Sequence, residues 1–220
     1  MNKLLIILLA LVFTGCATTT GYSRVPDQIT EWFESNSWRV ETPQSGGTGF
    51  WVNGQFLTAC HIVNRANIAY IHNIDRSRLT LTRVESCNQT LDMAVLVPID
   101  SPNNTIGDFK PLPITLADET PPIGTLLYSA GFPMGGPFGY SNGVLNSLSD
   151  NGYETTIYLV YGASGSPALA VNNGRIELVG IMLKFNSLTQ VFGDGNQREV
   201  EVFGSSLMYG IEDIKVALGA

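Results

Sequence analysis

From Trp38 onward, the apolar positions follow the two-residue period of β-strands. In the first half of the chain, this pattern predicts a strand and hairpin at 46–54, followed by short strands at 55–59, 68–71 and 79–84. In the second half, it predicts strands at 124–133, 139–148, 155–160, 167–171 and 177–185. Many short strands separated by turn residues are typical of small all-β barrels.

Two segments at the ends have helical spacing instead. Ile29, Trp32 and Phe33 lie three to four residues apart, which predicts a short helix over 27–35 with Pro26 near its start. The apolar positions of 205–218 predict an amphipathic C-terminal helix with a serine cap. Four of the 11 prolines fall within 109–122, and we expect this segment to cross between two barrels.

Length and composition narrow the function classes. A chain of 220 residues can build one globular unit or two small barrels that share an interface. The formal net charge of −7 argues against a nucleic-acid partner, which would normally need a basic face. No cluster of His, Cys, Asp or Glu has ligand spacing, so we expect neither a metal nor a cofactor.

The first sixteen residues form a separate unit. A positive start at Lys3 precedes an apolar run over 4–13 that is short for a membrane span, and the run ends in Thr14-Gly15-Cys16. This ending resembles a bacterial lipobox, although Phe13 stands where leucine is usual. The resemblance implies cleavage before Cys16 and acylation of the new terminus. A plain secretory signal with an incidental cysteine is the alternative.

Three short segments carry candidate chemistry, in a fixed order along the chain. They are 57–61 (LTACH), 91–96 (LDMAVL) and 162–167 (GASGSP). A serine hydroxyl is a weak nucleophile and needs a neighbouring imidazole as general base. That imidazole needs a carboxylate to fix its tautomer and stabilise its charged form. The three segments therefore predict Ser-His-Asp acyl-transfer chemistry.

Each segment offers one residue in a suitable local setting. His61 follows a short strand that would hold its ring at a barrel edge, whereas His72 has no such context. Asp92 stands before an apolar strand, where an unpaired charge would be costly. Glycines flank Ser164 and permit a tight turn that exposes its hydroxyl. The expected roles are general base for His61, orienting carboxylate for Asp92 and nucleophile for Ser164.

Together the three segments resemble those of trypsin-like serine proteases. The resemblance implies an all-β fold of two six-stranded antiparallel barrels with a short C-terminal helix. It divides the chain into a signal peptide (1–16), a tether with a short helix (17–45) and a protease domain (46–220). Within that domain, we expect barrel one over about 46–110, barrel two over about 123–205 and the helix over 205–218. By the same resemblance, the backbone amides of Gly162 and Ser164 bind the oxyanion.

Two further strings, AGFPMG at 130–135 and SNGVLNS at 141–147, resemble those of the high-temperature-requirement proteases. Because the resemblance spans roughly residues 46–218, we expect no peptide-binding PDZ module of the kind those proteases carry. Ala163 occupies the place where zymogen-activated digestive proteases carry an aspartate that pairs with a freed N-terminus. Because alanine cannot form this ion pair, we expect no activation by cleavage near Gly46.

Alignment with the family places the substrate pocket at Tyr158, with Leu183, Lys184 and Phe185 along one wall. Tyr158 and Phe185 would make a shallow apolar pocket, whereas Lys184 would recruit an acidic residue. Both aromatic rings could equally serve barrel packing.

Cys60 and Cys87 remain after processing, either as a disulfide or as two buried thiols.

The sequence thus predicts an exported, lipid-anchored serine endopeptidase that acts on protein or peptide substrates. Its expected location is the cell envelope. Ala17 is not the aspartate that retains some lipoproteins at the inner membrane, so the outer membrane facing the periplasm is the default. The alternative from another class is a catalytically silent peptide-binding protein that retains the fold. A third hypothesis is an esterase that uses the same triad.

Overall fold

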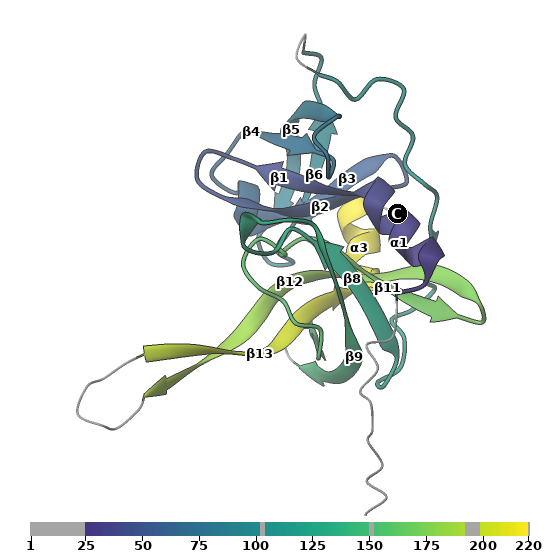
Figure 1. The fold of residues 1–220 in the computed structure, drawn as a ribbon, viewed down its shortest axis with the longest axis vertical. Coiled ribbons are helices and arrows are strands. Elements are labelled where there is room, and N and C mark those ends of the chain that lie inside the picture. Colours follow the sequence, from purple (N-terminus) through teal and green to yellow (C-terminus); the bar gives the residue numbers. More distant parts are fainter. Residues whose placement is uncertain (1–24, 102–103, 150–151, 192–198, 220) are drawn as a thin grey trace, which may run out of the picture.

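Two β-barrels stacked on one another make up most of the molecule (Figure 1). The computed structural model describes residues 25–101, 104–149, 152–191 and 199–219. The predicted signal peptide, with Cys16, therefore lies outside the described residues. No helix in the described part of the chain is long and apolar enough to cross a membrane.

The first barrel closes in the order β1-β2-β3-β6-β5-β4. Its strands are β1 (Ser37–Glu41), β2 (Gly46–Val52), β3 (Gln55–Ala59), β4 (Ile68–His72), β5 (Leu79–Asn88) and β6 (Met93–Pro98). The barrel begins at Ser37, inside the segment 17–45 that the sequence assigned to tether and helix. The reason is that β1 pairs with both β2 and β4, so the barrel would stay open without it.

The second barrel joins β11-β8-β9-β10-β13-β12, and pairing of β11 with β12 closes the ring. Its strands are β8 (Leu126–Gly131), β9 (Gly139–Ser149), β10 (Gly152–Thr155), β11 (Ser166–Asn172), β12 (Arg175–Val191) and β13 (Glu199–Gly210). A two-residue strand, β7 (Thr115–Leu116), adds to β12 in parallel. Beyond the barrel, β12 and β13 continue as a projecting two-stranded ribbon (Figure 1). The two predicted six-stranded barrels are thus confirmed.

Asn-Gly pairs form two of the hairpins. Asn53 and Gly54 separate β2 from β3 with φ angles of 49° and 78°. Asn173 and Gly174 separate β11 from β12 with φ angles of 48° and 78°. Positive φ at both central residues defines the type I′ turn, whose twist matches that of the flanking strands. These local sequences therefore set the strand register on either side of them.

The strand expected at 155–160 is wrong beyond Thr155, where β10 ends. The pairing of β10 with β9 shifts between Glu154 and Thr155, and the hydroxyl of Thr156 accepts the N–H of Val144 at 2.9 Å. Side-chain bonding of this kind competes with the backbone ladder. The backbone N–H of Thr156 still donates to the carbonyl of Val144 at 3.0 Å, and the chain leaves the sheet after this residue and continues to Ser164.

The C-terminal helix is present but shorter than the expected 205–218. It is α3 (Ile211–Leu218), and residues 205–210 belong to β13. The hydroxyl of Ser206 is buried and donates to the carbonyl of Ile157 at 2.7 Å, so it serves the barrel and does not cap the helix. Gly210 precedes the helix without a side-chain cap. The helix packs on β12, β13 and also β6, which places it against both barrels.

The predicted N-terminal helix is confirmed as α1 (Asp27–Asn36), which buries Ile29, Trp32 and Phe33. Its last residue, Asn36, binds the segment that crosses between the barrels. The side-chain amide of Asn36 donates to the carbonyls of Trp51 at 3.2 Å and Leu112 at 2.8 Å, and its oxygen accepts the N–H of Leu112 at 2.9 Å. A buried amide with several partners fixes one arrangement of these segments.

Cys60 and Cys87 form a disulfide, the first of the two arrangements open at the sequence level. It joins the residue before His61 to β5, across a sequence separation of 27. Cys60 is fully buried. The bridge thus braces the base of the segment that carries His61.

We expect Cys60→Ala combined with Cys87→Ala to lower the free energy of unfolding by roughly 3 kcal/mol, because the cross-link limits the unfolded chain. Denaturant unfolding measures this loss. Wild-type protein under reducing conditions is the control and should lose a similar amount. Equal stability of oxidised and reduced wild type would contradict a stabilising bridge.

Candidate active site

His61 stands at the second position of α2 (Cys60–Val63), a single helical turn that directly follows β3. The turn lifts its side chain away from the barrel wall, and that side chain is 40% exposed. The neighbours Cys60, Ile62 and Val63 are buried, so the turn is fixed while the imidazole stays accessible.

Asp92 immediately precedes β6 and adopts a left-handed backbone conformation with φ of 51°, which aspartate tolerates better than most residues. The side chain of Asn88 supports this turn by accepting the N–H groups of Thr90 and Leu91, both at 3.0 Å. The carbonyl of Asp92 in turn accepts the N–H of Cys60 at 2.8 Å. The backbone thereby aims the carboxylate at α2.

Both oxygens of the Asp92 carboxylate contact His61. Oδ1 accepts the backbone N–H of His61 at 2.9 Å, and Oδ2 lies 2.8 Å from the ring nitrogen Nδ1. The Asp92 side chain is only 6% exposed. The carboxylate therefore fixes both the position and the orientation of the imidazole.

Burial by itself raises the pKa of the Asp92 carboxyl, because a buried carboxylate loses hydration. Hydrogen bonds and charge from His61, together with the positive charge of Lys184, outweigh burial and hold the pKa of Asp92 below its ordinary value of 3.8. These contacts stabilise the folded protein. Their contribution is present above the ordinary pKa of Asp92 and is lost as the pH falls through the lowered pKa. Asp92 is therefore charged at neutral pH.

Ser164 occupies a tight turn between two glycines in left-handed conformations, Gly162 with φ of 85° and Gly165 with φ of 87°. The turn is closed internally, since the carbonyl of Ala163 accepts the N–H of Ser166 at 3.1 Å and its hydroxyl at 2.6 Å. Ser164 itself is half-buried. Within the described chain, the N–H groups of Gly162 and Ser164 bind no other residue.

The Ser164 turn lies directly against the first barrel. The carbonyl of Ser164 accepts the N–H of Thr48 on β2 at 3.0 Å. A Cβ atom on Gly165 would come within 2.1 Å of the carbonyl oxygen of Thr48 and 3.0 Å of the amide of Ala59. Because Ala59 lies two residues before His61, Ser164 and the Asp92–His61 pair meet at one junction between the barrels.

The buried hydroxyl of Thr48 joins three segments at this junction. It donates to the carbonyl of Gly162 at 2.9 Å and accepts the N–H of Phe132, at the end of β8, at 3.0 Å. The carbonyl of Thr48 accepts the hydroxyl of Thr58 on β3 at 2.7 Å. One side chain of the first barrel thus fixes the serine turn and the adjacent strand end of the second.

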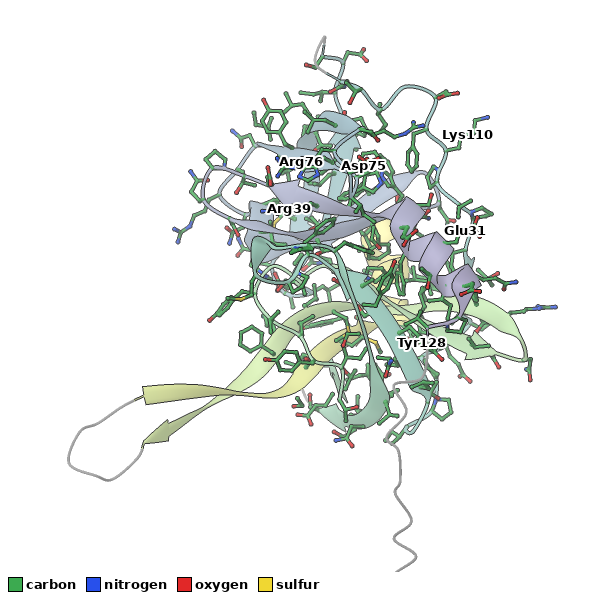
Figure 2. The ribbon with its side chains drawn as sticks, viewed as in Figure 1. Glu31, Arg39, Asp75, Arg76, Lys110 and Tyr128 are labelled. Carbon is green, nitrogen blue, oxygen red and sulfur yellow. A yellow bond between two sulfur atoms is a disulfide. The ribbon has the colours of Figure 1, made fainter. Side chains whose placement is uncertain are left out.

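A short 3-10 turn, η1 (Pro133–Gly135), supports the outer side of Gly162. A Cβ atom at Gly162 would approach the carbonyl of Phe132 to 2.4 Å and the amide of Gly135 to 3.0 Å, so only glycine fits. Arg39 on β1 holds this turn by donating to the carbonyl of Gly135 at 2.6 Å. Figure 2 shows Arg39 on the first barrel where it faces the second.

The four predicted pocket residues do not line one cavity. A pocket of about 270 Å³, lined mostly by apolar atoms, lies beside the Ser164 turn, and of the four only Tyr158 borders it. Leu183 is fully buried in the core. The ring of Phe185 packs edge-on against Tyr161 with centroids 5.1 Å apart. Lys184 faces Asp92, with Nζ 3.8 Å from Oδ2.

Sequence reasoning missed Thr48, Arg39 and the contact of Lys184 with Asp92. Thr48 carried a signal, because it is a polar residue within the otherwise apolar strand 46–52. Buried polar side chains of this kind are normally hydrogen-bonded. Arg39 and Lys184 had no such signal, since charged residues in strands usually face solvent.

The described residues contain no group of three or more His, Cys, Asp or Glu side chains that could hold a metal ion.

An imidazole oriented by a buried carboxylate in one barrel, together with a serine on a glycine turn of the other, is typical of trypsin-like serine peptidases. The family model described as a trypsin-like peptidase domain matches residues 47–181. The chain therefore belongs to the trypsin-like peptidase family and is a serine endopeptidase.

Solved structures agree on the fold. An inactive form of Rv3671c from M. tuberculosis H37Rv matches with a TM-score of 0.65 and 18% identity, over 89% of this chain and 90% of that one. The active form of the Rv3671c protease matches with a TM-score of 0.66 and 17% identity, over 87% and 82%. A serine endoprotease from Yersinia pestis matches with a TM-score of 0.59 and 22% identity, over 84% and 63%. No curated protein matches the chain.

We expect Thr48→Val to lower the free energy of unfolding by about 1–3 kcal/mol, because the carbonyl of Gly162 and the N–H of Phe132 lose their partner. It should also slow the reaction of Ser164 with a fluorophosphonate probe. Denaturant unfolding and labelling rates measure the two effects. Thr48→Ser keeps the hydroxyl and should preserve most of both. Equal behaviour of the two variants would show that the hydroxyl does not hold the turn.

Proposed function

We propose that the chain hydrolyses peptide bonds in protein or peptide substrates through an acyl-enzyme on Ser164. His61 is the general base, and Asp92 orients it. The observation that carries this proposal is the double contact between the Asp92 carboxylate and His61 at the junction that also holds Ser164. A carboxylate only accepts hydrogen bonds, so the neutral ring carries its proton on Nδ1 and leaves Nε2 free to accept one.

In the proposed reaction, Nε2 of His61 takes the proton of the Ser164 hydroxyl as its Oγ attacks the substrate carbonyl carbon. The charge of the imidazolium that forms is stabilised by Asp92. The negative charge on the tetrahedral oxygen is stabilised by the N–H groups of Gly162 and Ser164. His61 then passes its proton to the leaving amine, and water hydrolyses the acyl-enzyme by the same steps.

The substrate backbone would add as an extended strand beside the segment that follows Gly180 and Ile181. This placement brings the scissile carbonyl to the Ser164 turn.

The position of Lys184 against Asp92 makes it a poor partner for an acidic substrate residue, because Asp92 already offsets its charge. The apolar pocket bordered by Tyr158 supports the apolar preference among the two specificities considered.

Labelling of the full chain with a fluorophosphonate probe tests the proposal. We expect covalent labelling of the wild type and none of Ser164→Ala. Asp92→Asn should lower the labelling rate by roughly 10³–10⁴-fold, because asparagine tolerates the same backbone conformation but favours the wrong imidazole tautomer. Cleavage of an unfolded protein substrate, followed by gel electrophoresis, then tests for endopeptidase action.

A catalytically silent peptide-binding protein is the alternative. It predicts a well-folded wild type that the probe does not label, together with saturable peptide binding. That result would overturn the assignment of Ser164 as nucleophile. If the probe labels the protein and simple esters are hydrolysed, but no peptide is cleaved, the esterase hypothesis would be favoured instead.

We further propose that the chain is exported and lipid-anchored through Cys16, in the outer membrane facing the periplasm. Residues 1–16 support export and acylation. The Cys60–Cys87 disulfide supports an oxidising compartment independently of the signal sequence. Several acyl chains on one terminus would give stable attachment, whereas a single chain gives only marginal binding.

Metabolic labelling with radioactive palmitate, in a bacterium that processes lipoproteins, tests the anchor. We expect the wild type to take up the label and to sediment with outer membranes, whereas Cys16→Ser should do neither. Ser23→Ala, in the predicted tether, is a control and should behave like the wild type. An unlabelled, soluble wild type would favour a plain secretory signal.

A further inference from the structure

The carboxylate of Asp92 contacts not only His61 but also a cation, the ammonium group of Lys184. Nζ of Lys184 lies 3.8 Å from Oδ2 of Asp92, the same oxygen that contacts Nδ1 of His61 at 2.8 Å. The Asp92 side chain is almost fully buried, whereas that of Lys184 is 54% exposed. The imidazole of His61 from the first barrel and the ammonium of Lys184 from the second therefore share one carboxylate oxygen.

The path of β12 explains why Lys184 reaches this position. The carbonyl of Met182 accepts the N–H of Gly165 at 2.7 Å, which holds β12 beside the Ser164 turn. Successive side chains of a strand point to opposite faces. Met182 and Leu183 are both fully buried, so this alternation is broken here, and Lys184 is the first exposed residue after them. The register of β12 and β13 also shifts between Met182 and Lys184.

Other charged groups near the pair are already engaged or lie elsewhere. On β5 and α3, which pack against α2 or β6, the charged residues are Arg83, Glu85, Glu212, Asp213 and Lys215, and Arg65 lies just after α2. Arg83 pairs with Glu85 at 2.7 Å, and Glu212 binds Thr120. Among the side chains that the structure describes, only His61 and Lys184 form ion pairs with Asp92.

We propose that Lys184 is a positioning residue that acts on the general base through Asp92 and sets the acidic limb of the enzyme's pH profile. This inference rests on the proposed role of His61 and Asp92. A cation beside the carboxylate reduces the stabilisation that Asp92 can offer to the protonated imidazole. Removal of the Lys184 charge is therefore expected to favour the imidazolium over the neutral, base-competent ring.

The second-order rate constant for fluorophosphonate labelling of the full chain, measured from pH 4.5 to 9 (roughly the range in which a histidine base titrates), tests this proposal. Lys184→Met should move the midpoint of the acidic limb upward by roughly 0.2–0.7 pH units, because a half-exposed pair couples weakly. Labelling on that limb should then fall by up to about fivefold, with the alkaline plateau unchanged. Lys184→Arg should restore the wild-type midpoint.

Lys110→Met is the matched control, since it removes the same charge from an exposed residue of the segment between the barrels. It should leave the midpoint unchanged. Raising the ionic strength should move the wild-type midpoint toward that of Lys184→Met, because salt screens exposed charges. An equal midpoint in all variants, an equal shift in Lys110→Met, or a changed plateau with an unchanged midpoint would each overturn the proposal.

A second readout separates this inference from the proposed function. The chain has two histidines, so the ring proton signals of His61 can be followed by NMR as the pH changes. An upward shift of the His61 titration midpoint in Lys184→Met supports the coupling even if the probe does not label the wild type. In that case the proposed function fails, while the effect of Lys184 on His61 stands. No shift in the NMR titration overturns the inference whether or not Ser164 reacts.

Discussion

The hydroxyl of Thr48 is the contact on which the active-site geometry depends. It donates to the carbonyl of Gly162 and accepts the N–H of Phe132, while the backbone of the same residue binds Ser164 and Thr58. A hydroxyl can serve both partners because it is donor and acceptor at once. The serine turn of the second barrel is therefore positioned by the wall of the first, and the two halves of the site cannot move independently.

Close backbone packing makes this junction stiff. At Gly162 and Gly165, a side chain would collide with backbone atoms of neighbouring segments, and both residues need a left-handed conformation. Asp92 reaches its own left-handed conformation with help from Asn88. Stiffness of this kind suits catalysis, because donors and the general base must be in place before charge develops. The positions of Gly162, Gly165 and Asp92 are thus fixed by the backbone around them.

Elements far from the candidate active site hold the two barrels in a fixed position relative to each other. Helix α3 packs on strands of both barrels, and Asn36 of α1 fixes the crossing segment through three hydrogen bonds. The disulfide at Cys60 braces the other side of His61. Because Ser164 lies on the second barrel and His61 on the first, these supports fix the two residues relative to each other.

Local sequence determined the parts of this protein whose geometry is local. The Asn-Gly hairpins, the glycine turn at Ser164 and helix α1 all follow from the backbone preferences of neighbouring residues. The tertiary structure alone decided the Cys60–Cys87 pairing, the end of β10, the start of α3, the burial of Leu183 and the contact of Lys184 with Asp92. The physical reason is range: Thr48 binds partners 84 and 114 residues away, and no local pattern encodes which distant segment will meet a given side chain.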